Sequence, residues 1–255
     1  MSALLHIRDA RITRGRAHIL NSVSFEAEAG EFIGVIGPNG AGKSTLLRVC
    51  SGLEALGSGA ALINGAPVGA LAPTLRARAV SYLPQTRPLF WSMSVEAIVA
   101  LGRFAYGAPE TLEGKDAKAV ERAIAATGIG HLRGRPATEL SGGEAARMHL
   151  ARALAGETPI LLADEPTAAL DPRHQLTVMR AMRARADDGT LVIAAIHDIA
   201  LAARFCTRIL LIENGRLTAT GTPQETLTAR NLSEAFSAAA QVNLTEGRIR
   251  IEFEA

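Results

Sequence analysis

Residues 37–44 read Gly37-Pro38-Asn39-Gly40-Ala41-Gly42-Lys43-Ser44, and this stretch decides the fold class. It follows the short apolar run Phe32-Ile33-Gly34-Val35-Ile36 and precedes a helical pattern that starts at Ser44 and Thr45. A buried strand, a glycine-rich turn and a helix in this order are typical of the phosphate-binding loop. The order therefore predicts an α/β nucleotide-binding fold.

The residue types in this loop each have a chemical task. Glycines allow backbone N–H groups to approach phosphate oxygens and cradle them at the start of a helix. The ammonium of Lys43 has the position that reaches the β and γ phosphates, and the hydroxyl of Ser44 has the position that ligates magnesium. A match to the phosphate-loop pattern alone arises by chance in some glycine-rich turns. Here the flanking strand and helix favour a true nucleotide-binding loop. We expect residues 37–45 to bind nucleotide.

Two further apolar runs predict a parallel sheet. They cover residues 160–163 and 191–196, and neither alternates polar with apolar side chains. Such runs are typical of parallel strands that helices bury on both faces. Because ligands bind at the carboxyl ends of parallel strands, we expect four residues to converge at one edge of the sheet. They are Gly37, Asp164, Glu165 and His197.

The acidic pair Asp164-Glu165 fits phosphoryl chemistry at this edge. One carboxylate can hold magnesium, commonly through water, and its neighbour can polarise the water that attacks the γ phosphate. The alternative is a solvated strand-end pair before the turn at Pro166. Beside a phosphate loop the functional interpretation is favoured: Asp164 as a metal ligand and Glu165 as the catalytic carboxylate.

A second glycine-bearing motif reads Leu140-Ser141-Gly142-Gly143-Glu144 and precedes a helical run. Ser141 and Glu144 have the spacing of a capping box, which is the structural interpretation. The same helix start also presents N–H groups and the positive end of the helix dipole to an anion. Capping and phosphate binding are compatible, so both interpretations stay open.

The rest of the chain reads as one domain over residues 1–255. Asn-Gly pairs at residues 64–65 and 214–215 predict hairpins, and hence an antiparallel β portion beside the core. Residues 86–156 are rich in Ala, Glu, Arg and Leu and predict an inserted helical subdomain. Residues 242–253 alternate apolar and polar side chains like a last hairpin, with no recognisable chemistry.

Composition limits the partners and the compartment. The 255 residues are 48% hydrophobic and 20% charged, and a net charge of +2 is too small for a nucleic-acid footprint. Cys50 and Cys206 lie in apolar stretches and predict buried thiols in a reducing compartment. The first residues lack the apolar core of a signal peptide, and the longest apolar segment is broken by His197 and Asp198. We therefore expect a cytoplasmic protein that meets a membrane only at its surface.

The motifs stand in the order found in the ABC (ATP-binding cassette) ATPases, which the chain resembles over nearly its whole length. The order is the phosphate loop, Leu140 to Glu144, the strand that ends in Asp164-Glu165-Pro166, Ala169-Leu170-Asp171 and His197. The Leu-Ser-Gly-Gly-Glu motif is the most specific part. The resemblance implies a P-loop NTPase (RecA-like) core with a flanking antiparallel β portion and an inserted helical subdomain.

The resemblance also implies roles for residues that would otherwise mean little. Gln85 looks like the glutamine that contacts magnesium or its waters and links the site to a transmembrane partner. His197 would contact the γ phosphate and hold the catalytic geometry. A lone Gln in a loop is commonly solvated, and a lone His at a strand end is commonly structural.

Residues of a second copy would complete each site. By the resemblance, Ser141, Gly142 and Gly143 of one copy close over the ATP that Lys43 of the other copy holds, and Asp171 orders the opposing site. The resemblance implies a homodimer that closes on two ATP molecules with Mg²⁺, hydrolyses them with the help of Glu165, and reopens on product release.

One departure concerns the nucleobase. Relatives often stack adenine on an aromatic residue upstream of the first core strand, where this chain has Arg14. We expect Arg14 or nearby His18 to stack instead. A second departure is Ala145-Ala146, where many relatives carry longer polar residues.

A narrower resemblance points to the importer ATPases for iron-siderophore complexes, haem and cobalamin. It is carried by Tyr82-Leu83-Pro84-Gln85, by residues 99–103 and by residues 197–204. It implies a separate membrane permease, a periplasmic or extracellular substrate-binding protein, and a place on the cytoplasmic face of the bacterial inner membrane. Residues 87–93, with Phe90 and Trp91, are either part of the permease groove or subdomain core. Substrate selectivity resides in the other subunits.

Two alternatives belong to other classes. The first is a soluble ABC ATPase that acts on nucleic acid or ribosomes, but the paired cassettes or long insertions of such proteins are not visible here. The second is a small-molecule phosphotransferase, which needs an acceptor site and no Leu-Ser-Gly-Gly-Glu motif. Residues 140–144 argue against the second.

Overall fold

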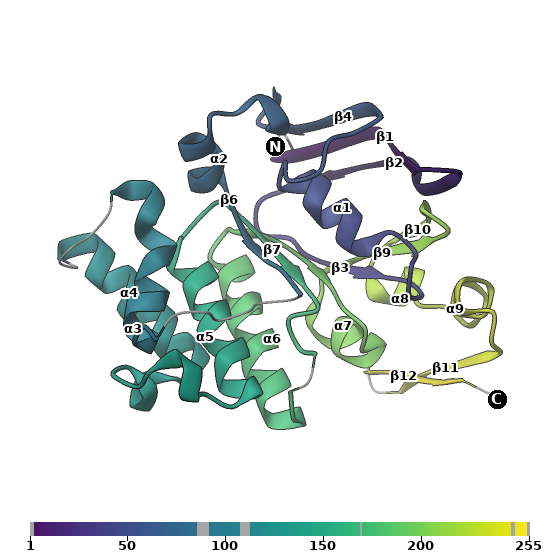
Figure 1. Ribbon diagram of the computed structural model, residues 1–255. Helices are drawn as coiled ribbons and strands as arrows, with labels where there is room; N and C mark the ends of the chain where they lie inside the picture. The colour runs from purple at the N-terminus through teal and green to yellow at the C-terminus, as the bar shows by residue number, and fades with distance from the viewer. Residues whose placement is uncertain (1–2, 86–91, 108–112, 169, 246–247, 254–255) are drawn as a thin grey trace.

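The computed structural model describes residues 3–85, 92–107, 113–168, 170–245 and 248–253 (Figure 1). Its centre is a six-stranded sheet in the order β10-β9-β3-β8-β7-β6. Five of its strands run parallel, and β10 adds antiparallel to β9 at one edge. The strands are β3 (Phe32–Ile36), β6 (Val80–Leu83), β7 (Ile160–Asp164), β8 (Leu191–Ala195), β9 (Arg208–Glu213) and β10 (Arg216–Gly221).

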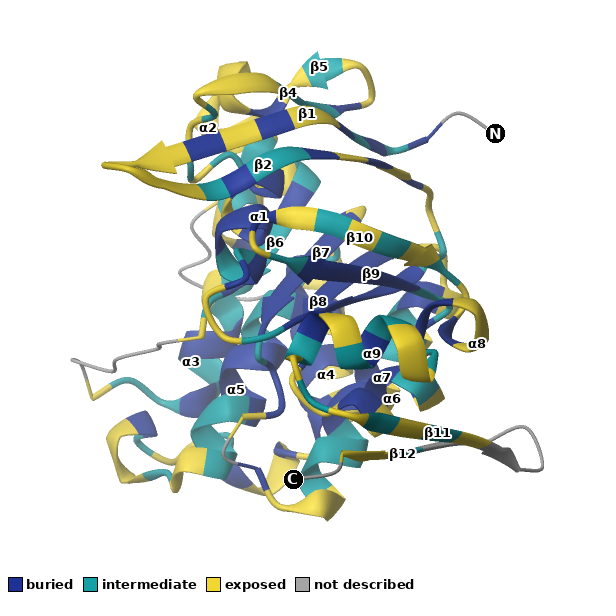
Figure 2. Cartoon of the chain, turned by 90° about the vertical axis from the view of Figure 1, so that its right-hand side faces the viewer, coloured by how far each residue is buried: buried dark blue, intermediate teal, exposed yellow. Residues whose placement is uncertain are grey.

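A second, antiparallel sheet has the order β2-β1-β4-β5 and lies beside the central sheet (Figures 1 and 2). Its strands are β1 (Leu5–Arg14), β2 (Ala17–Ala27), β4 (Ser58–Ile63) and β5 (Ala66–Pro67). Both Asn-Gly hairpins are confirmed: β4 turns into β5 at residues 64–65, and β9 turns into β10 at residues 214–215. Both residues of each turn have positive φ, as Asn-Gly turns require.

Helices cover both faces of the central sheet. They are α1 (Lys43–Cys50), α2 (Pro73–Ala79), α3 (Val95–Ala100), α4 (Gly114–Thr127), α5 (Gly142–Ala155), α6 (Pro172–Asp187), α7 (Ile199–Phe205), α8 (Pro223–Thr226) and α9 (Ala229–Phe236). Short 3₁₀ turns are η1 (Val68–Ala70), η2 (Leu101–Tyr106), η3 (Gly130–Leu132) and η4 (Ala137–Glu139). In the described part of the chain, no helix is both long and apolar enough to cross a bilayer.

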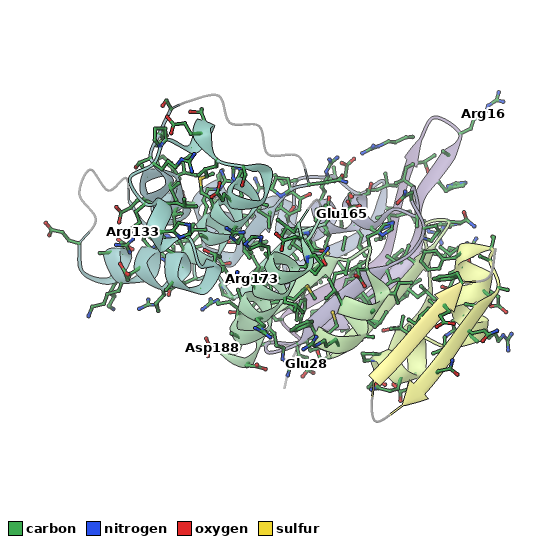
Figure 3. All side chains as sticks on the ribbon, turned by 90° about the horizontal axis from the view of Figure 1, so that it is seen from below. Arg16, Glu28, Arg133, Glu165, Arg173 and Asp188 are labelled. Carbon is green, nitrogen blue, oxygen red and sulfur yellow. The ribbon has the colours of Figure 1, made fainter. Side chains whose placement is uncertain are left out.

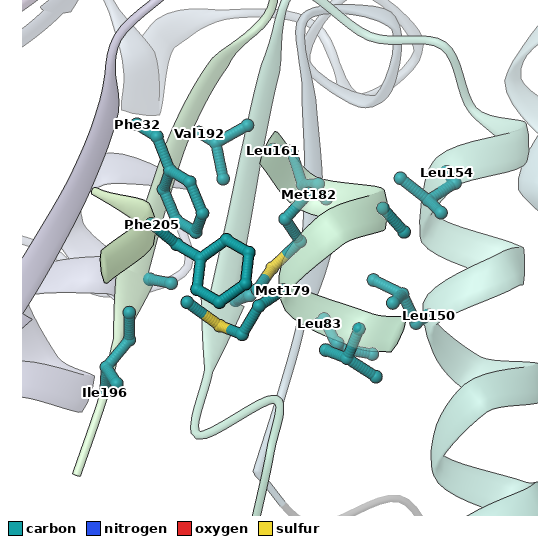
Figure 4. Close-up of a cluster of buried hydrophobic side chains, with 14 of the residues drawn as sticks. Phe32, Leu83, Leu150, Leu154, Leu161, Met179, Met182, Val192, Ile196 and Phe205 are labelled. Atoms are coloured by element: carbon teal, nitrogen blue, oxygen red, sulfur yellow. The ribbon is translucent and has the colours of Figure 1, made fainter. Parts of the chain in front are cut away.

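The core alternates between the two faces of the sheet, because neighbouring side chains on a strand point in opposite directions. On β3, Phe32 and Ile36 pack with α3 to α7, whereas Ile33 and Val35 pack on the side of α1 and the antiparallel sheet. Figure 4 shows Phe32 and Val192 of the first side in one cluster with Phe205, Met179 and Met182 of the helices. Strands β3, β7 and β8 are buried along their whole length, as non-alternating apolar runs predict.

The helices α3, α4 and α5 pack against one another at one end of the molecule (Figure 1). With η2, η3 and η4 they form the described part of residues 86–156. The apolar side of α5, which includes Met148 and Leu150, is buried. Phe90 and Trp91 lie outside the described residues.

The chain ends in a two-stranded hairpin, as its alternating pattern predicts. Strands β11 (Ala240–Thr245) and β12 (Arg248–Phe253) pair with each other and lie beside α7 and α9 (Figure 2). Both cysteines are buried free thiols. Burial raises the pKa of Cys50 to about 12 and also raises the pKa of Cys206.

Candidate functional site

The phosphate loop joins the end of β3 to the start of α1, and two of its glycines are required by shape. A Cβ atom on Gly37 would lie 2.0 Å from the Ile212 carbonyl oxygen, and one on Gly42 would lie 2.6 Å from that of Ile19. Gly42 also has a φ of 102°. The loop is therefore wedged between the strand β9 and the antiparallel sheet. Only residues without a side chain fit at these two positions.

Lys43 is the first residue of α1 and is 7% exposed. Its ammonium donates hydrogen bonds to the carbonyl oxygens of Gly37, at 2.7 Å, and Pro38, at 2.9 Å. Desolvation by burial lowers the pKa of Lys43, while the negative charges of Glu165 and Asp164 oppose that shift. The cation thus lies inside the loop, next to the acidic pair.

Asp164 ends β7 and is 2% exposed. Its carboxylate accepts hydrogen bonds from the Ser44 hydroxyl, at 3.0 Å, and from the Tyr82 hydroxyl, at 3.4 Å. Desolvation by burial raises the pKa of Asp164, although the hydrogen bond from Ser44 opposes this. Hydroxyl and carboxylate oxygens are hard donors of the kind that Mg²⁺ prefers, so the Ser44–Asp164 pair fits this ion.

Glu165 follows β7 in a left-handed conformation with a φ of 47°. Its N–H donates to the Ala195 carbonyl oxygen at the end of β8, at 3.1 Å. Its carboxylate accepts a hydrogen bond of 2.7 Å from the side-chain amide of Gln85. Positive φ is uncommon outside glycine and clusters at functional positions. Figure 3 shows Glu165 near the middle of the molecule, between the helical end and the N-terminal strands.

One pocket of about 510 Å³ lies at this end of the sheet. It brings together the predicted residues of the phosphate loop from Asn39 to Thr45 with Gln85, Glu165 and His197. Arg14 and Ile19 of the antiparallel sheet complete its lining. The pocket therefore joins residues from five separate parts of the sequence, and four of these parts lie at the carboxyl ends of the parallel strands, as parallel sheets predict.

The other predicted loop residues lie around this pocket rather than in its wall. Gly37 and Pro38 line a neighbouring hollow that shares Asn39 and His197 with the pocket. Asp164 lies behind Ser44.

The second glycine motif is a capping box on α5, as its spacing predicts. The Ser141 hydroxyl donates to the Glu144 carboxylate at 2.8 Å, and the Glu144 N–H donates to that hydroxyl at 3.3 Å. Neither Ser141, Gly142 nor Gly143 is among the residues that line the nucleotide pocket. Asp171 likewise caps α6, by accepting from the His174 N–H at 2.9 Å. Within one described chain, these four residues and the phosphate loop form separate sites.

Three residues at the site were not assigned chemistry from the sequence. Tyr82 contacts Asp164, Ile19 lines the pocket, and Glu54 holds the guanidinium of Arg14 at 2.8 Å. The sequence has no motif that marks them: Tyr82 reaches Asp164 because β6 pairs with β7, and Glu54 is 40 positions from Arg14. His18 forms a hydrogen bond with Thr13 and is not among the residues that line the pocket.

Comparison with known proteins identifies the family. The sequence profile of the family described as "ABC transporter" matches residues 20–168. The hemin import ATP-binding protein HmuV of Pseudomonas fluorescens (strain Pf0-1) is 43% identical over 91% of this chain and 92% of its own length. The cobalamin import ATP-binding protein BtuD of Halobacterium salinarum (strain ATCC 29341 / DSM 671 / R1) is 40% identical over 88% of this chain and 56% of its own.

A solved structure agrees with the sequence relatives. The ATP-binding cassette MJ0796, a dimer in a post-hydrolysis state bound to ADP and Pi, superposes with a TM-score of 0.76. It is 25% identical, over 86% of this chain and 98% of its own. The predicted fold class is thereby confirmed. The chain belongs to the ABC transporter family, whose cassettes bind and hydrolyse ATP.

Proposed function

We propose that this chain is the ATP-hydrolysing subunit of an importer that takes up an iron complex or cobalamin, with haem favoured, through a separate permease. The observation that carries the proposal is the single pocket that gathers Lys43, Gln85, Glu165 and His197. The choice of haem rests on the name of the relative that is 43% identical. Siderophore-iron complexes and cobalamin are the other candidate substrates of the importer.

The loop and Lys43 bind the phosphates. The Lys43 ammonium moves from the carbonyl oxygens of Gly37 and Pro38 to the β and γ phosphate oxygens, a short reorientation within the same loop. Ser44, Asp164 and Gln85 are positioned to hold Mg²⁺, directly or through water, and the bound ion would neutralise phosphate charge. Arg14, fixed by Glu54, is positioned to stack on the nucleobase.

Glu165 is the residue that receives the proton of the attacking water. Its carboxylate borders the pocket and is held by the Gln85 amide, so its free oxygen can accept a hydrogen bond from that water. His197 also lines the pocket and would donate a hydrogen bond to the γ phosphate. Gln85 directly precedes the helical part of the chain and donates a hydrogen bond to Glu165. A shift of the helical part would therefore move Gln85 and change its hydrogen bond with Glu165.

A second copy completes the site. Ser141, Gly142 and Gly143 lie outside the pocket of their own chain, at an exposed helix start that favours phosphate. We propose that they close over the nucleotide of the partner copy and that Asp171 orders that contact. Two ATP molecules would then lie between two copies, each held by both.

The permease meets the helical part, residues 86–156, in this proposal. On η2, Leu101 is 45% exposed and Phe104 is 67% exposed, and on the neighbouring α2, Leu75 is 58% exposed. Exposed apolar side chains of neighbouring elements are typical of interaction surfaces. The subunit would work at the cytoplasmic face of the bacterial inner membrane, and a substrate-binding protein would deliver cargo from the other side.

The test is phosphate release from MgATP by the wild-type chain and by Glu165→Gln, with sizing chromatography of both in ATP. We expect hydrolysis to fall by about 100-fold or more, because the base is lost while its shape is kept. The variant should accumulate as an ATP-bound dimer. If it hydrolyses ATP like the wild type, Glu165 is not the base. If the chain purifies with nucleic acid instead of a permease, the importer assignment is wrong.

A further inference from the structure

The C-terminal hairpin forms one wall of a hollow whose other wall carries His197. The hollow measures about 460 Å³ and shares Asn39 and His197 with the nucleotide pocket. One wall is apolar and comes from the end of the chain, namely Phe236, Ile251 and Phe253. The facing wall is formed by residues 197–200, at the start of α7, and by residues 37–39 of the phosphate loop. The hairpin thus lies next to the reacting end of the site.

Apolar contacts join the described part of the hairpin to α7, α9 and the main core. Strand β12 packs against α7, and the rings of Phe236 and Phe253 lie 5.5 Å apart between centroids at an angle of 59°. The half-buried Val242 and Ile251 pack against the main core. The Ala240 N–H donates to the Ser233 hydroxyl at 2.9 Å, which joins the start of the hairpin to α9. These contacts hold the hairpin against α7 and α9.

His197 depends on its backbone for its position. Its side chain is exposed and makes no hydrogen bond with the described residues. Before it, the Ile196 N–H donates to the Val35 carbonyl oxygen at 3.1 Å, which ties this side to the sheet. After it, Asp198 caps α7 by accepting from the Leu201 N–H at 3.0 Å. The backbone before His197 is therefore fixed by the sheet. The backbone after it is fixed only if α7 is held in place.

Helix α7 needs support, because a seven-residue helix is marginal without packing. Its inner side, with Ile199 and Ala202, faces the main core. Its outer cover is β12, which has Phe253 at its end, still 43% exposed. If this cover is weakened, the start of α7 gains freedom, and so does His197.

We propose that the C-terminal hairpin is a positioning element for His197, with Phe253 as its principal contact and Ile251 as the second. The inference rests on the proposed role of His197 toward the γ phosphate. The hairpin does not touch nucleotide in this scheme. It narrows the range of His197 positions by covering α7, and small displacements of a catalytic group cost rate more than binding.

The test is Phe253→Ala in the full chain, with Phe253→Tyr as the conservative variant and Asn243→Ala as the matched control. Asn243 is exposed on the other strand of the same hairpin. We expect kcat for ATP to fall about three- to tenfold in Phe253→Ala while KM stays within about twofold, since binding residues are untouched. Phe253→Tyr and Asn243→Ala should keep the wild-type kcat. Amide exchange of residues 196–201 should rise in Phe253→Ala alone.

The outcomes separate this inference from the proposed function. An unchanged kcat in both Phe253→Ala and Ile251→Ala, with His197→Ala inactive, overturns the positioning role and leaves the function intact. The same holds if kcat falls without faster amide exchange at residues 196–201, because the effect then bypasses α7. If His197→Ala hydrolyses ATP at the wild-type rate, the role of His197 is wrong and the inference fails with it.

Discussion

Helices α1 and α5 both start next to a glycine of a predicted phosphate-binding motif, and their first turns are built in opposite ways. Helix α1 starts after Gly42, has no side-chain cap, and lies at the wall of the nucleotide pocket. Helix α5 starts after Ser141, carries a complete capping box with Glu144, and is exposed at its start, at Ser141 and Gly142. The first helix start leaves its N–H groups for a ligand. The second satisfies part of its own N–H groups and does not line the nucleotide pocket of its chain.

This difference teaches that a glycine-rich helix start is half of a phosphate site. At α1 the other half is in the same chain, because Lys43, Glu165 and His197 surround it. At α5 a Cβ atom on Gly142 would meet no atom within 4 Å, so the surface there is open to a second molecule. We therefore expect damage at α1 to abolish binding and damage at α5 to spare it.

The largest expected effect comes from variants at the starts of α1 and α5, tested separately and then mixed. Lys43→Ala should lower hydrolysis by about 100-fold or more, since it removes the cation from the phosphates. Gly142→Asp should keep nucleotide affinity in the isolated chain but lower hydrolysis by about tenfold or more, through like-charge repulsion of the partner's ATP. An equal mixture of both variants should regain up to about a quarter of the wild-type rate, because half of the pairs hold one intact site. Phosphate release measures all three.

The control for the added charge is Gly134→Asp, in the same helical region, where a Cβ atom also meets nothing within 4 Å. It should hydrolyse ATP like the wild type. If the mixture stays inactive although both variants fold and pair, the two glycine ends do not serve one site.

A smaller effect should come from the base end of the pocket. Arg14→Ala should raise KM for ATP about three- to tenfold with kcat unchanged, because a stacking contact of about 1 kcal/mol is lost equally in both states. Arg14→Tyr should restore KM. Arg16 lies at the tip of the same hairpin (Figure 3) and is not among the residues that line the pocket, so Arg16→Ala separates stacking from simple charge. Equal KM changes in both variants would contradict the stacking role.

The smallest effect is a shift in thermal stability, which should have opposite signs at the nucleotide site and at the cap of α5. Desolvation raises the pKa of Asp164, so the folded chain holds that proton longer than the unfolded chain. Stability is then lost as pH rises from the unfolded pKa through the folded one, and the loss persists at pH 7. Asp164→Asn should raise Tm by about 2–4 °C at pH 7. Ser141→Ala should lower Tm by about 2–4 °C, because it removes a satisfied cap.

Calorimetry without nucleotide measures both shifts. The gain for Asp164→Asn should vanish at acidic pH, where Asp164 is protonated in both states. A pH-independent gain would mean that burial of the charge is not its cause. The same variant should lose hydrolysis, since a neutral amide is a poor ligand for Mg²⁺.

The strands and loops of the nucleotide site could be predicted from local patterns. The apolar runs became β3, β7 and β8, both Asn-Gly pairs became hairpins, and Ser141 with Glu144 became a capping box. Each of these patterns lies within a few consecutive residues, so it can be recognised from the local sequence alone.

What the sequence could not predict depends on contacts between distant segments. The Gln85–Glu165 hydrogen bond joins residues 80 positions apart, and Arg14 meets Glu54 across 40. The last hairpin was predicted as a hairpin, but its place against α7 follows from packing with no sequence motif. The place of Phe90 and Trp91, in the permease groove or in the subdomain core, remains a prediction.

The two buried cysteines have a practical consequence for watching the cassette move. Cys50 and Cys206 lie inside the core with raised pKa values, so neither is a thiolate at neutral pH. Maleimide dyes, which react with thiolates, should leave the natural chain unlabelled. A single cysteine placed at Arg16, at the hairpin tip, would then carry the dye alone. Energy transfer between two copies labelled in this way could follow their closing and reopening during turnover, with no native residue removed from the core.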